Sequence, residues 1–313
     1  MDIIESGDVV DQMIVDGKKV VDEAVNHVVK ELNKPIYGIV AAFSGGDDSI
    51  VVTHFANEYL DDCCTFNADT MTGLKPTRDH IDKCIETYKW TSEIIQATAE
   101  GMPGESGTES NKFVRDNWRE GETAYEEYVL NHGFGGPAMH PRMFQRLKER
   151  PLMKLRRKLA NGERGGRVIV ISGVRHDESA IRAGYKRAWQ DVPKQGLTWV
   201  NPFYYRTAED FALYRDEFGL PRNPVKQRCG ISGECCCGTF GSKDEREAYK
   251  QIDPVFHKYL ADLETKVRER FPWGWGNGPP KWFMDKKRGQ KFLWEFEDLK
   301  FQPMCVGCNN GRR

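Results

Sequence analysis

Serine, glycine and aspartate residues stand together at 44–49, directly after an apolar run at 36–43. The segment reads Ser44, Gly45, Gly46, Asp47, Asp48 and Ser49. Adjacent glycines let the backbone turn sharply and bring its N–H groups close to an anion. The stretch at 50–56 is helix-like, and the amino end of a helix adds unpaired N–H donors and positive dipole charge. The pattern predicts a cradle for phosphate or pyrophosphate, although a glycine turn before a capped helix also occurs in α/β proteins without a ligand.

The nine cysteines give a second chemical signal. Cys63, Cys64 and Cys84 lie in apolar or helical contexts typical of core residues. The other six form two tight groups late in the chain: Cys229, Cys235, Cys236, Cys237, Cys305 and Cys308. Thiolates are soft ligands that select iron–sulfur clusters, zinc or copper. The clustering predicts a metal site, and on spacing alone four-cysteine zinc competes with an iron–sulfur cluster. Six unligated thiols are the simpler alternative.

The elements that must position these residues alternate between strand and helix. Apolar residues at helical spacing predict a helix over 8–33. Strands are expected at 36–43, 63–67, 93–97 and 167–173, with a further helix over 77–90. This alternation predicts an α/β fold with a parallel twisted sheet and helices on both faces. Ligands of such sheets bind beyond the carboxyl ends of the strands, where 44–49, 69–73 and 173–182 are expected to converge.

Charge is balanced, with 46 basic and 47 acidic residues, so the chain is not a globally basic nucleic-acid binder. Locally, residues 142–167 carry ten Lys or Arg against Glu149 and Glu163. This bias suits an anionic partner such as nucleic acid, or a solvated helix face. Aromatic and basic residues interleave at 271–301, which fits base stacking or a small core equally well. With no apolar run of bilayer length and no signal-peptide pattern, we expect a cytoplasmic protein without a membrane partner.

Four segments, in order, resemble one family. Residues 44–49 are similar to its pyrophosphate loop, S-G-G-x-D-S, and residues 69–77 to its D-T-G-x-x-x-P-E-T stretch, with two extra residues and no glutamate. Residues 173–182 are similar to its G-x-R-x-x-E-S-x-x-R segment, and residues 201–224 to its N-P to L-P-x-N-P stretch. This is the phosphoadenosine phosphosulfate (PAPS) reductase family of PP-loop ATP pyrophosphatases. Its members include adenylyl-sulfate reductases and the DndC-type iron–sulfur sulfurtransferases of DNA phosphorothioation, which the chain resembles most in character.

The resemblance implies an adenine nucleotide α-hydrolase-like fold and an adenine nucleotide as partner. The residues that it assigns to the nucleotide are Ser44, Gly45, Gly46, Asp48, Ser49, Asp69, Gly173, Arg175 and Arg182. Arg175 and Arg182 would pair with phosphate or sulfate oxygens through the planar guanidinium fork. The complete S-G-G-x-D-S favours ATP, cleaved between its α- and β-phosphates. Mg²⁺ would bridge the phosphates, with Asp48 as the nearest carboxylate.

Members of the family that carry a [4Fe–4S] cluster hold it with a Cys-Cys pair and a distant C-x-x-C. The resemblance therefore favours a [4Fe–4S] cluster here. Its expected ligands are Cys229, Cys237, Cys305 and Cys308, with Cys235 and Cys236 as substitutes. A thiol of Cys235 or Cys236 that the cluster leaves free could carry persulfide sulfur or act as a nucleophile. The expected catalytic residues are Asp48, Arg175, Cys235 and Cys236.

We expect a PP-loop domain over 1–225 and a cysteine-rich cluster-binding segment over 226–313. The implied activity is ATP-dependent sulfur transfer: an acceptor, expected to be nucleic acid, is adenylated, and sulfur then displaces AMP. A cysteine desulfurase-like protein would supply the sulfur. The first alternative is an adenylyl-sulfate or phosphoadenylyl-sulfate reductase, which ranks second because residues 309–313 lack the catalytic Glu-Cys-Gly-(Leu/Ile)-His tail of those enzymes. The second alternative is a non-catalytic nucleotide- and DNA-binding component of a modification complex.

Overall fold

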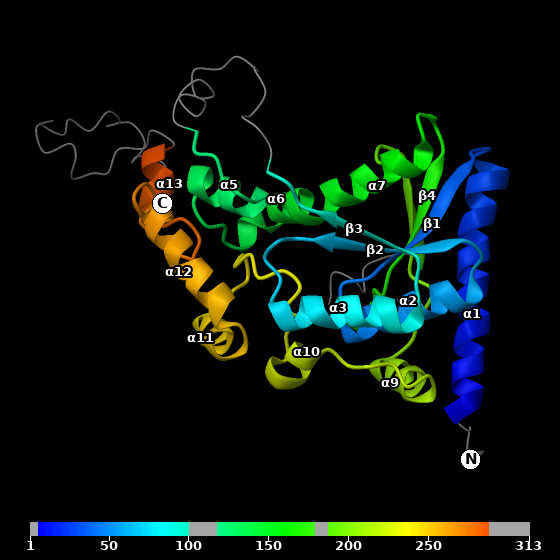
Figure 1. Cartoon of the computed structure of the whole chain (residues 1–313). Coiled ribbons are helices and arrows are strands. Elements are labelled where there is room, and N and C mark those ends of the chain that lie inside the picture. The colour runs from blue at the N-terminus through cyan, green and yellow to red at the C-terminus, as the bar shows by residue number, and fades with distance from the viewer. Residues whose placement is uncertain (1–5, 100–117, 179–186, 288–313) are drawn as a thin grey trace, which may run out of the picture.

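A computed structural model describes residues 6–99, 118–178 and 187–287 (Figure 1). Its centre is a six-stranded sheet with the order β3-β2-β1-β4-β6-β5. The strands are β1 (Ile36–Ala42), β2 (Cys63–Asp69), β3 (Ser92–Gln96), β4 (Arg167–Ile171), β5 (Trp189–Val192) and β6 (Leu197–Val200). All neighbours pair in parallel except β5, which is antiparallel to β6. The expected parallel sheet is confirmed, with one antiparallel edge strand added.

The central strand β4 is buried throughout, which explains its unbroken apolar sequence. Its side chains alternate between the two faces of the sheet. Ile169 and Ile171 face a core built with α1 (Ser6–Asn26), α2 (Asp47–Tyr59), α3 (Lys75–Tyr88) and α9 (Ala208–Glu217). Val168 and Val170 face a second core with α7 (Arg150–Ala160). Helices therefore cover both faces of the sheet, as the sequence predicts (Figure 1).

The predicted helix over 8–33 is α1 followed by a π-helical turn at His27–Glu31. The basic segment is also helical, because α6 (His140–Phe144), a π-helical turn at Gln145–Glu149 and α7 follow one another without a break. Short 3₁₀ turns lie at Pro137–Met139 and His176–Glu178. Within the described part of the chain, no helix combines the length and the apolar character needed to cross a membrane.

The late part of the chain forms a helical layer beyond the ends of β2 and β3 (Figure 1). It contains α10 (Pro224–Cys229), α11 (Lys243–Ile252), α12 (Pro254–Arg268) and α13 (Lys281–Lys287). Tyr249, Leu260 and Trp273 of this layer share a core with α5 (Ala124–His132), which the chain inserts between β3 and β4. The division at residue 225 stays a prediction, and the helical layer draws on residues from both sides of it.

Candidate functional site

The phosphate-loop segment joins β1 to α2 at the centre of the sheet. Gly45 has a φ of +71°, and a Cβ there would lie 2.7 Å from Ile81 Cγ1, so only glycine fits. The Oγ of Ser49 accepts from the backbone N–H groups of Gly46 at 3.0 Å and of Ser44 at 3.3 Å. Two backbone donors thus converge on one hydroxyl at the amino end of α2. The same donors have the arrangement that suits a phosphate oxygen.

Gly173 and Arg175 follow β4 and lie against this loop. The strand order changes direction between β1 and β4, which is where ligands bind in open α/β sheets. A Cβ on Gly173 would lie 3.0 Å from the carbonyl carbon and oxygen of Asp48. The Arg175 guanidinium pairs with Asp48 at 3.3 Å and with Asp177 at 2.8 Å, and it lies over the Phe211 ring. Two carboxylates therefore hold Arg175 beside the phosphate loop.

Asp69 lies at the carboxyl end of β2, on the same edge of the sheet. Its carboxylate accepts from the backbone N–H of Met71 at 3.0 Å and pairs with Arg78 at 3.4 Å. The predicted convergence of 44–49, 69–73 and the segment after β4 thus holds for every part that the structure describes. Arg182, the second predicted arginine, lies outside the described residues.

Two residues at this site, Asp47 in the loop and Asn223 beside it, were not predicted as site residues from the sequence. Asp47 is buried and accepts hydrogen bonds from Arg222 Nη2 at 3.2 Å and from the backbone N–H of Asn223 at 3.3 Å. The Asn223 side chain donates to the carbonyl oxygen of Gly45 at 2.8 Å. Both contacts come from the L-P-R-N-P stretch at 220–224, which the family resemblance identified without assigning a role.

The cysteine loop at 232–237 docks on the loop after β2. The backbone N–H of Leu74 donates to Gly233 O at 2.8 Å, and that of Cys236 donates to Thr72 O at 3.0 Å. The Thr70 hydroxyl donates to Glu234 O at 2.9 Å. The described late cysteines therefore lie on the same edge of the sheet as the phosphate loop.

The three thiols of the cysteine loop differ in burial, because Cys236 and Cys237 are buried and Cys235 is partly exposed. A hydrogen bond between the thiols of Cys235 and Cys237 lowers the pKa of Cys237 and raises that of Cys235. Burial raises the pKa of Cys236 to about 12, and its thiol bonds to Tyr249 in the apolar core. Cys235 and Cys236 therefore both have a raised pKa, and Cys235 is the more exposed of the two predicted nucleophiles.

A cavity of about 370 Å³ is lined by Cys235, Cys236 and Cys237. Lys148, on the π-helical turn, reaches into it and pairs with Glu234 at 2.5 Å. Burial alone would lower the Lys148 pKa, but the attraction of Glu234 and Cys235 raises it, so the side chain is an ammonium ion. A fixed positive charge therefore faces the thiols.

The predicted metal ligands are brought together only in part. In the described ranges no group of three or more His, Cys, Asp or Glu side chains could hold a metal ion. Cys229, at the end of α10, consequently does not complete a site with Cys235 and Cys237. Cys305 and Cys308 lie outside the described residues.

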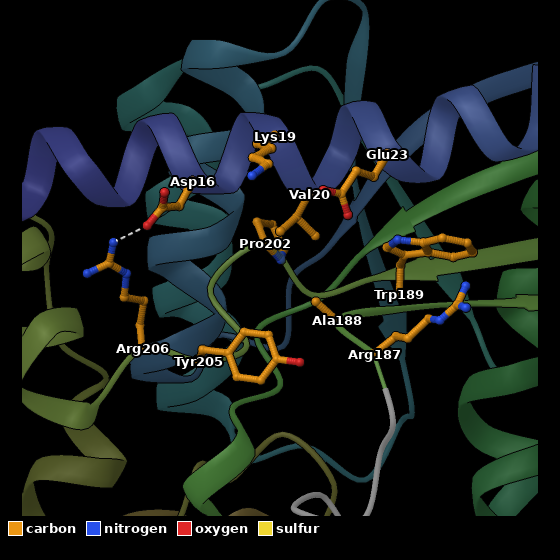
Figure 2. Close-up of a pocket in the computed structure, with 10 residues that line it drawn as sticks. All are labelled: Asp16, Lys19, Val20, Glu23, Arg187, Ala188, Trp189, Pro202, Tyr205 and Arg206. Atoms are coloured by element: carbon orange, nitrogen blue, oxygen red, sulfur yellow. Dashed lines mark hydrogen bonds and ion pairs between the residues drawn. The ribbon is translucent and has the colours of Figure 1, made fainter.

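A second cavity, of about 450 Å³, lies between α1 and the residues around β5 and β6 (Figure 2). Asp16, Lys19 and Glu23 line it from α1, and Trp189 and Tyr205 line it from the other side. An ion pair between Asp16 and Arg206 crosses its edge. Cations and carboxylates are thus mixed within it, and it includes none of the predicted site residues.

Part of the positive charge at 142–167 is paired with acidic residues elsewhere in the fold, and one of these pairs, Lys158 with Glu93, lies on the surface. The pairs are Arg146 with Glu127, Lys148 with Glu234, Lys158 with Glu93, and Arg167 with Asp191. Arg142, Lys154 and Arg157 stay exposed. Of the aromatic residues at 271–301, Trp273 and Trp275 belong to the helical core, whereas Trp282 is exposed. Phe292 and Trp294 lie outside the described residues.

Comparison with known proteins agrees with the resemblance. Residues 38–230 match the phosphoadenosine phosphosulfate reductase domain family, and the chain belongs to this family. It is accordingly a PP-loop enzyme, with the phosphate loop and Arg175 at the expected strand ends. No curated protein sequence matches the chain.

Three solved structures illustrate the similarity of fold. A phosphoadenylyl-sulfate reductase from Candida auris, in a phosphate complex, is 15% identical, with 73% of this chain and 93% of that chain covered and a TM-score of 0.44. An NMN synthetase from Francisella tularensis is 14% identical, covering 92% and 99%, with a TM-score of 0.42. A U34-tRNA thiolase from Methanococcus maripaludis, with its [4Fe–4S] cluster, is 12% identical, covering 92% and 90%, with a TM-score of 0.38.

Proposed function

We propose that the chain is an ATP-dependent sulfurtransferase that adenylates an acceptor and then replaces the activated oxygen with sulfur. The observation that carries the proposal is the position of Cys235 and Cys237. They occupy a cavity on the loop after β2, at the same edge of the sheet as the phosphate loop. The two-stage reaction needs both a nucleotide site and a sulfur nucleophile, and their shared edge of the sheet supports the proposal.

In the first stage, an acceptor oxygen attacks the α-phosphate of ATP. The bond to the bridging oxygen breaks, pyrophosphate leaves, and the acceptor proton passes to solvent. The N–H groups of Ser44 and Gly46 and the Arg175 guanidinium would stabilise the charge that develops on the departing group. Asp48 engages Arg175 through Oδ2, so its other carboxylate oxygen would help to place Mg²⁺.

In the second stage, Cys235 would carry the sulfur as a persulfide, loaded by a persulfide donor such as a cysteine desulfurase-like protein. The terminal sulfur attacks the carbon that bears the adenylated oxygen, the carbon–oxygen bond breaks, and AMP leaves. An external dithiol then splits the disulfide between Cys235 and the acceptor, releasing the thiolated product and becoming a disulfide itself. The Lys148 ammonium would stabilise the persulfide anion.

The residues fit an iron–sulfur cluster in part. Cys237 has a readily ionised thiol, and ligation requires the thiolate. Cys237, Cys305 and Cys308 would hold the cluster, with Cys235 as the free thiol beside it; Cys229 would have to move to join them, because it completes no site with Cys235 and Cys237 here. When bound, the cluster would supply a metal site for sulfur next to Cys235. The burial of Cys236 leaves Cys235 as the better candidate for the sulfur carrier.

Nucleic acid is the proposed acceptor. Arg142, Lys154 and Arg157 are exposed along the α6–α7 helix, which contributes Lys148 to the thiol cavity. Exposed cations on one helix suit contacts with a phosphate backbone. This is the part of the basic segment that supports an anionic partner after the internal ion pairs are set aside.

The test mixes purified full-length protein with ATP and a persulfide donor, with and without DNA or RNA. We expect nucleic acid to stimulate pyrophosphate release and ³⁵S to enter the nucleic acid. Cys235→Ser should keep pyrophosphate release and cluster absorbance but abolish sulfur incorporation, whereas Cys236→Ser should retain both activities. Release of sulfite from an activated sulfate would instead identify a reductase. Absence of pyrophosphate under every condition would refute the adenylation step and favour a binding component.

A further inference from the structure

One buried side chain links the phosphate loop to the cysteine loop. Asn223 is fully buried, and its Nδ2 donates to Gly45 O at 2.8 Å and to Ser232 O at 2.9 Å. Its Oδ1 accepts from the backbone N–H groups of Val225 at 2.8 Å and Lys226 at 3.3 Å, capping α10. All the polar groups of this side chain are therefore engaged in joining three segments.

The contact with Gly45 fixes the orientation of the phosphate loop. In a trans peptide the carbonyl oxygen and the following N–H point in opposite directions. Holding Gly45 O towards Asn223 consequently directs the Gly46 N–H away from it, and this N–H is one of the two donors that converge on Ser49. The backbone N–H of Asn223 adds a bond to Asp47 in the first turn of α2.

The contact with Ser232 fixes the start of the cysteine loop. Ser232 O also accepts from the Thr77 hydroxyl at 2.7 Å. Gly233 has a φ of +67°, and a Cβ there would lie 2.9 Å from Thr77 Oγ1. From Gly233 onwards the loop is bonded to residues 70–74. A movement of Ser232 would therefore be passed along a short, bonded segment to Cys235.

We propose that Asn223 is a positioning residue that couples occupancy of the phosphate loop to the reactivity of Cys235. This inference rests on the proposed function. A phosphate that accepts the Gly46 N–H in place of Ser49 would shift the Gly45–Gly46 peptide. That shift would move the Asn223 side-chain amide, which is bonded to both Gly45 O and Ser232 O. A ligand shifts an equilibrium only through contacts that differ between two states, and we expect the hydrogen bonds of the Asn223 amide to be such contacts. Nucleotide in the loop would thus order the cysteine loop before sulfur is delivered.

The test measures alkylation of Cys235 by iodoacetamide, read by peptide mass spectrometry, with and without saturating α,β-methylene ATP. In the full-length wild-type protein, we expect the nucleotide to slow alkylation by about fivefold or more, the lower range of coupling between sites. In Asn223→Ser, the hydroxyl still caps α10 but cannot bridge both carbonyls. This response should fall below about twofold, while calorimetry still detects nucleotide binding. If the nucleotide simply shielded Cys235, it would still slow alkylation in this variant. Loss of the slowing therefore identifies the Asn223 side chain as the link between the two loops.

Asn131→Ser is the matched control. Asn131 is also buried and donates to two carbonyl oxygens, those of Arg119 and Glu127, but it does not contact either loop. Asn131→Ser should lose about as much stability as Asn223→Ser, but nucleotide should still slow the alkylation of Cys235 as in the wild type. If Asn223→Ser fails to fold, Asn223→Asp replaces it, because it keeps the size and the capping oxygen and removes both donated protons.

Two results would overturn the inference: an unchanged Cys235 rate in wild-type protein that binds nucleotide, or a wild-type response in Asn223→Ser. Either result leaves the proposed function intact if pyrophosphate release and sulfur incorporation are seen. A wild-type protein that neither binds nor cleaves ATP would refute the proposed function together with the inference.

Discussion

Gly173→Ala offers a sharp test of the phosphate-loop geometry, because it adds one methyl group against backbone rather than side chain. The new Cβ would lie 3.0 Å from the carbonyl carbon and oxygen of Asp48 and 3.2 Å from the Ser49 nitrogen. These atoms must give by a few tenths of an ångström. Ile50 and Val51, immediately after them, are fully buried and hold α2 in place. The displacement is therefore expected to fall on the phosphate loop.

The expected magnitudes follow from this geometry. Overpacking of a well-filled site destabilises by about 1–3 kcal/mol, and so small a shift belongs at the lower end. A loss of about 1 kcal/mol lowers Tm by roughly 2 °C in a chain of this size. Misplacement of reacting groups by 1 Å can reduce a rate about a hundredfold, so a shift of a few tenths should reduce kcat/KM roughly threefold to tenfold. Tenfold corresponds to about 1.4 kcal/mol of lost transition-state stabilisation.

The assay is pyrophosphate release from ATP at a temperature well below the melting transition, with thermal unfolding measured in parallel. Gly38→Ala is the control, because its Cβ would meet only the flexible Leu159 side chain, at 3.4 Å. We expect Gly38→Ala to keep kcat/KM within about twofold of wild type. Wild-type kcat/KM in Gly173→Ala, or an equal loss in Gly38→Ala, would refute the reasoning.

Two further predictions concern stability. Burial lowers the pKa of His54, which bonds to Tyr214, so the unfolded chain takes up a proton near pH 6.5 while the folded protein takes it up only at lower pH. The contribution of neutral His54 to the free energy of unfolding is complete above pH 6.5 and is lost as the pH falls below 6.5. Denaturant titrations of wild type and His54→Gln from pH 7.5 to 5 should show a shallower pH dependence in the variant, and equal slopes would contradict this. Asp191→Asn should destabilise by about 3 kcal/mol, because it leaves the buried Arg167 guanidinium without its bidentate partner at 2.6 and 3.1 Å. Asp79→Asn, which breaks an exposed pair with Lys75, should lose less than about 1 kcal/mol in the same measurement, and comparable losses in the two variants would be inconsistent with a buried ion pair.

The sequence predicts the first four strands and the phosphate loop because their signals are local. Strand β4 is a continuous apolar run, and the glycine pair after β1 marks its turn without reference to distant residues. Strands β5 and β6 were not predicted. Each has four residues, and their pairing, for example Trp189 with Val200, depends on contacts between segments rather than on a periodic pattern. Strands as short as these carry little local information.

The roles of Asn223 and Cys236 could not be read from sequence for a related reason. Asn223 donates to the carbonyl oxygens of Gly45 and Ser232. Every residue has a backbone carbonyl, so the amino-acid types at 45 and 232 do not indicate these bonds. Cys235, Cys236 and Cys237 line one cavity, and they differ in burial, since Cys236 and Cys237 belong to the helical core and Cys235 packs against it. The basic segment shows the same limit, because the partners of Lys158 and Arg167 are the distant residues Glu93 and Asp191.

The π-helical turn at Gln145–Glu149 makes one helix serve two environments. Met143 before the turn and Leu147 within it pack in the helical layer, whereas Leu152 and Leu155 after the turn pack on the sheet. A π turn holds one more residue than an α turn, and one residue corresponds to about 100° of rotation. Shortening the turn by a single residue would leave every amino acid type in place but rotate one half against the other. The chain length between these two cores is thus as tightly specified as the residues themselves.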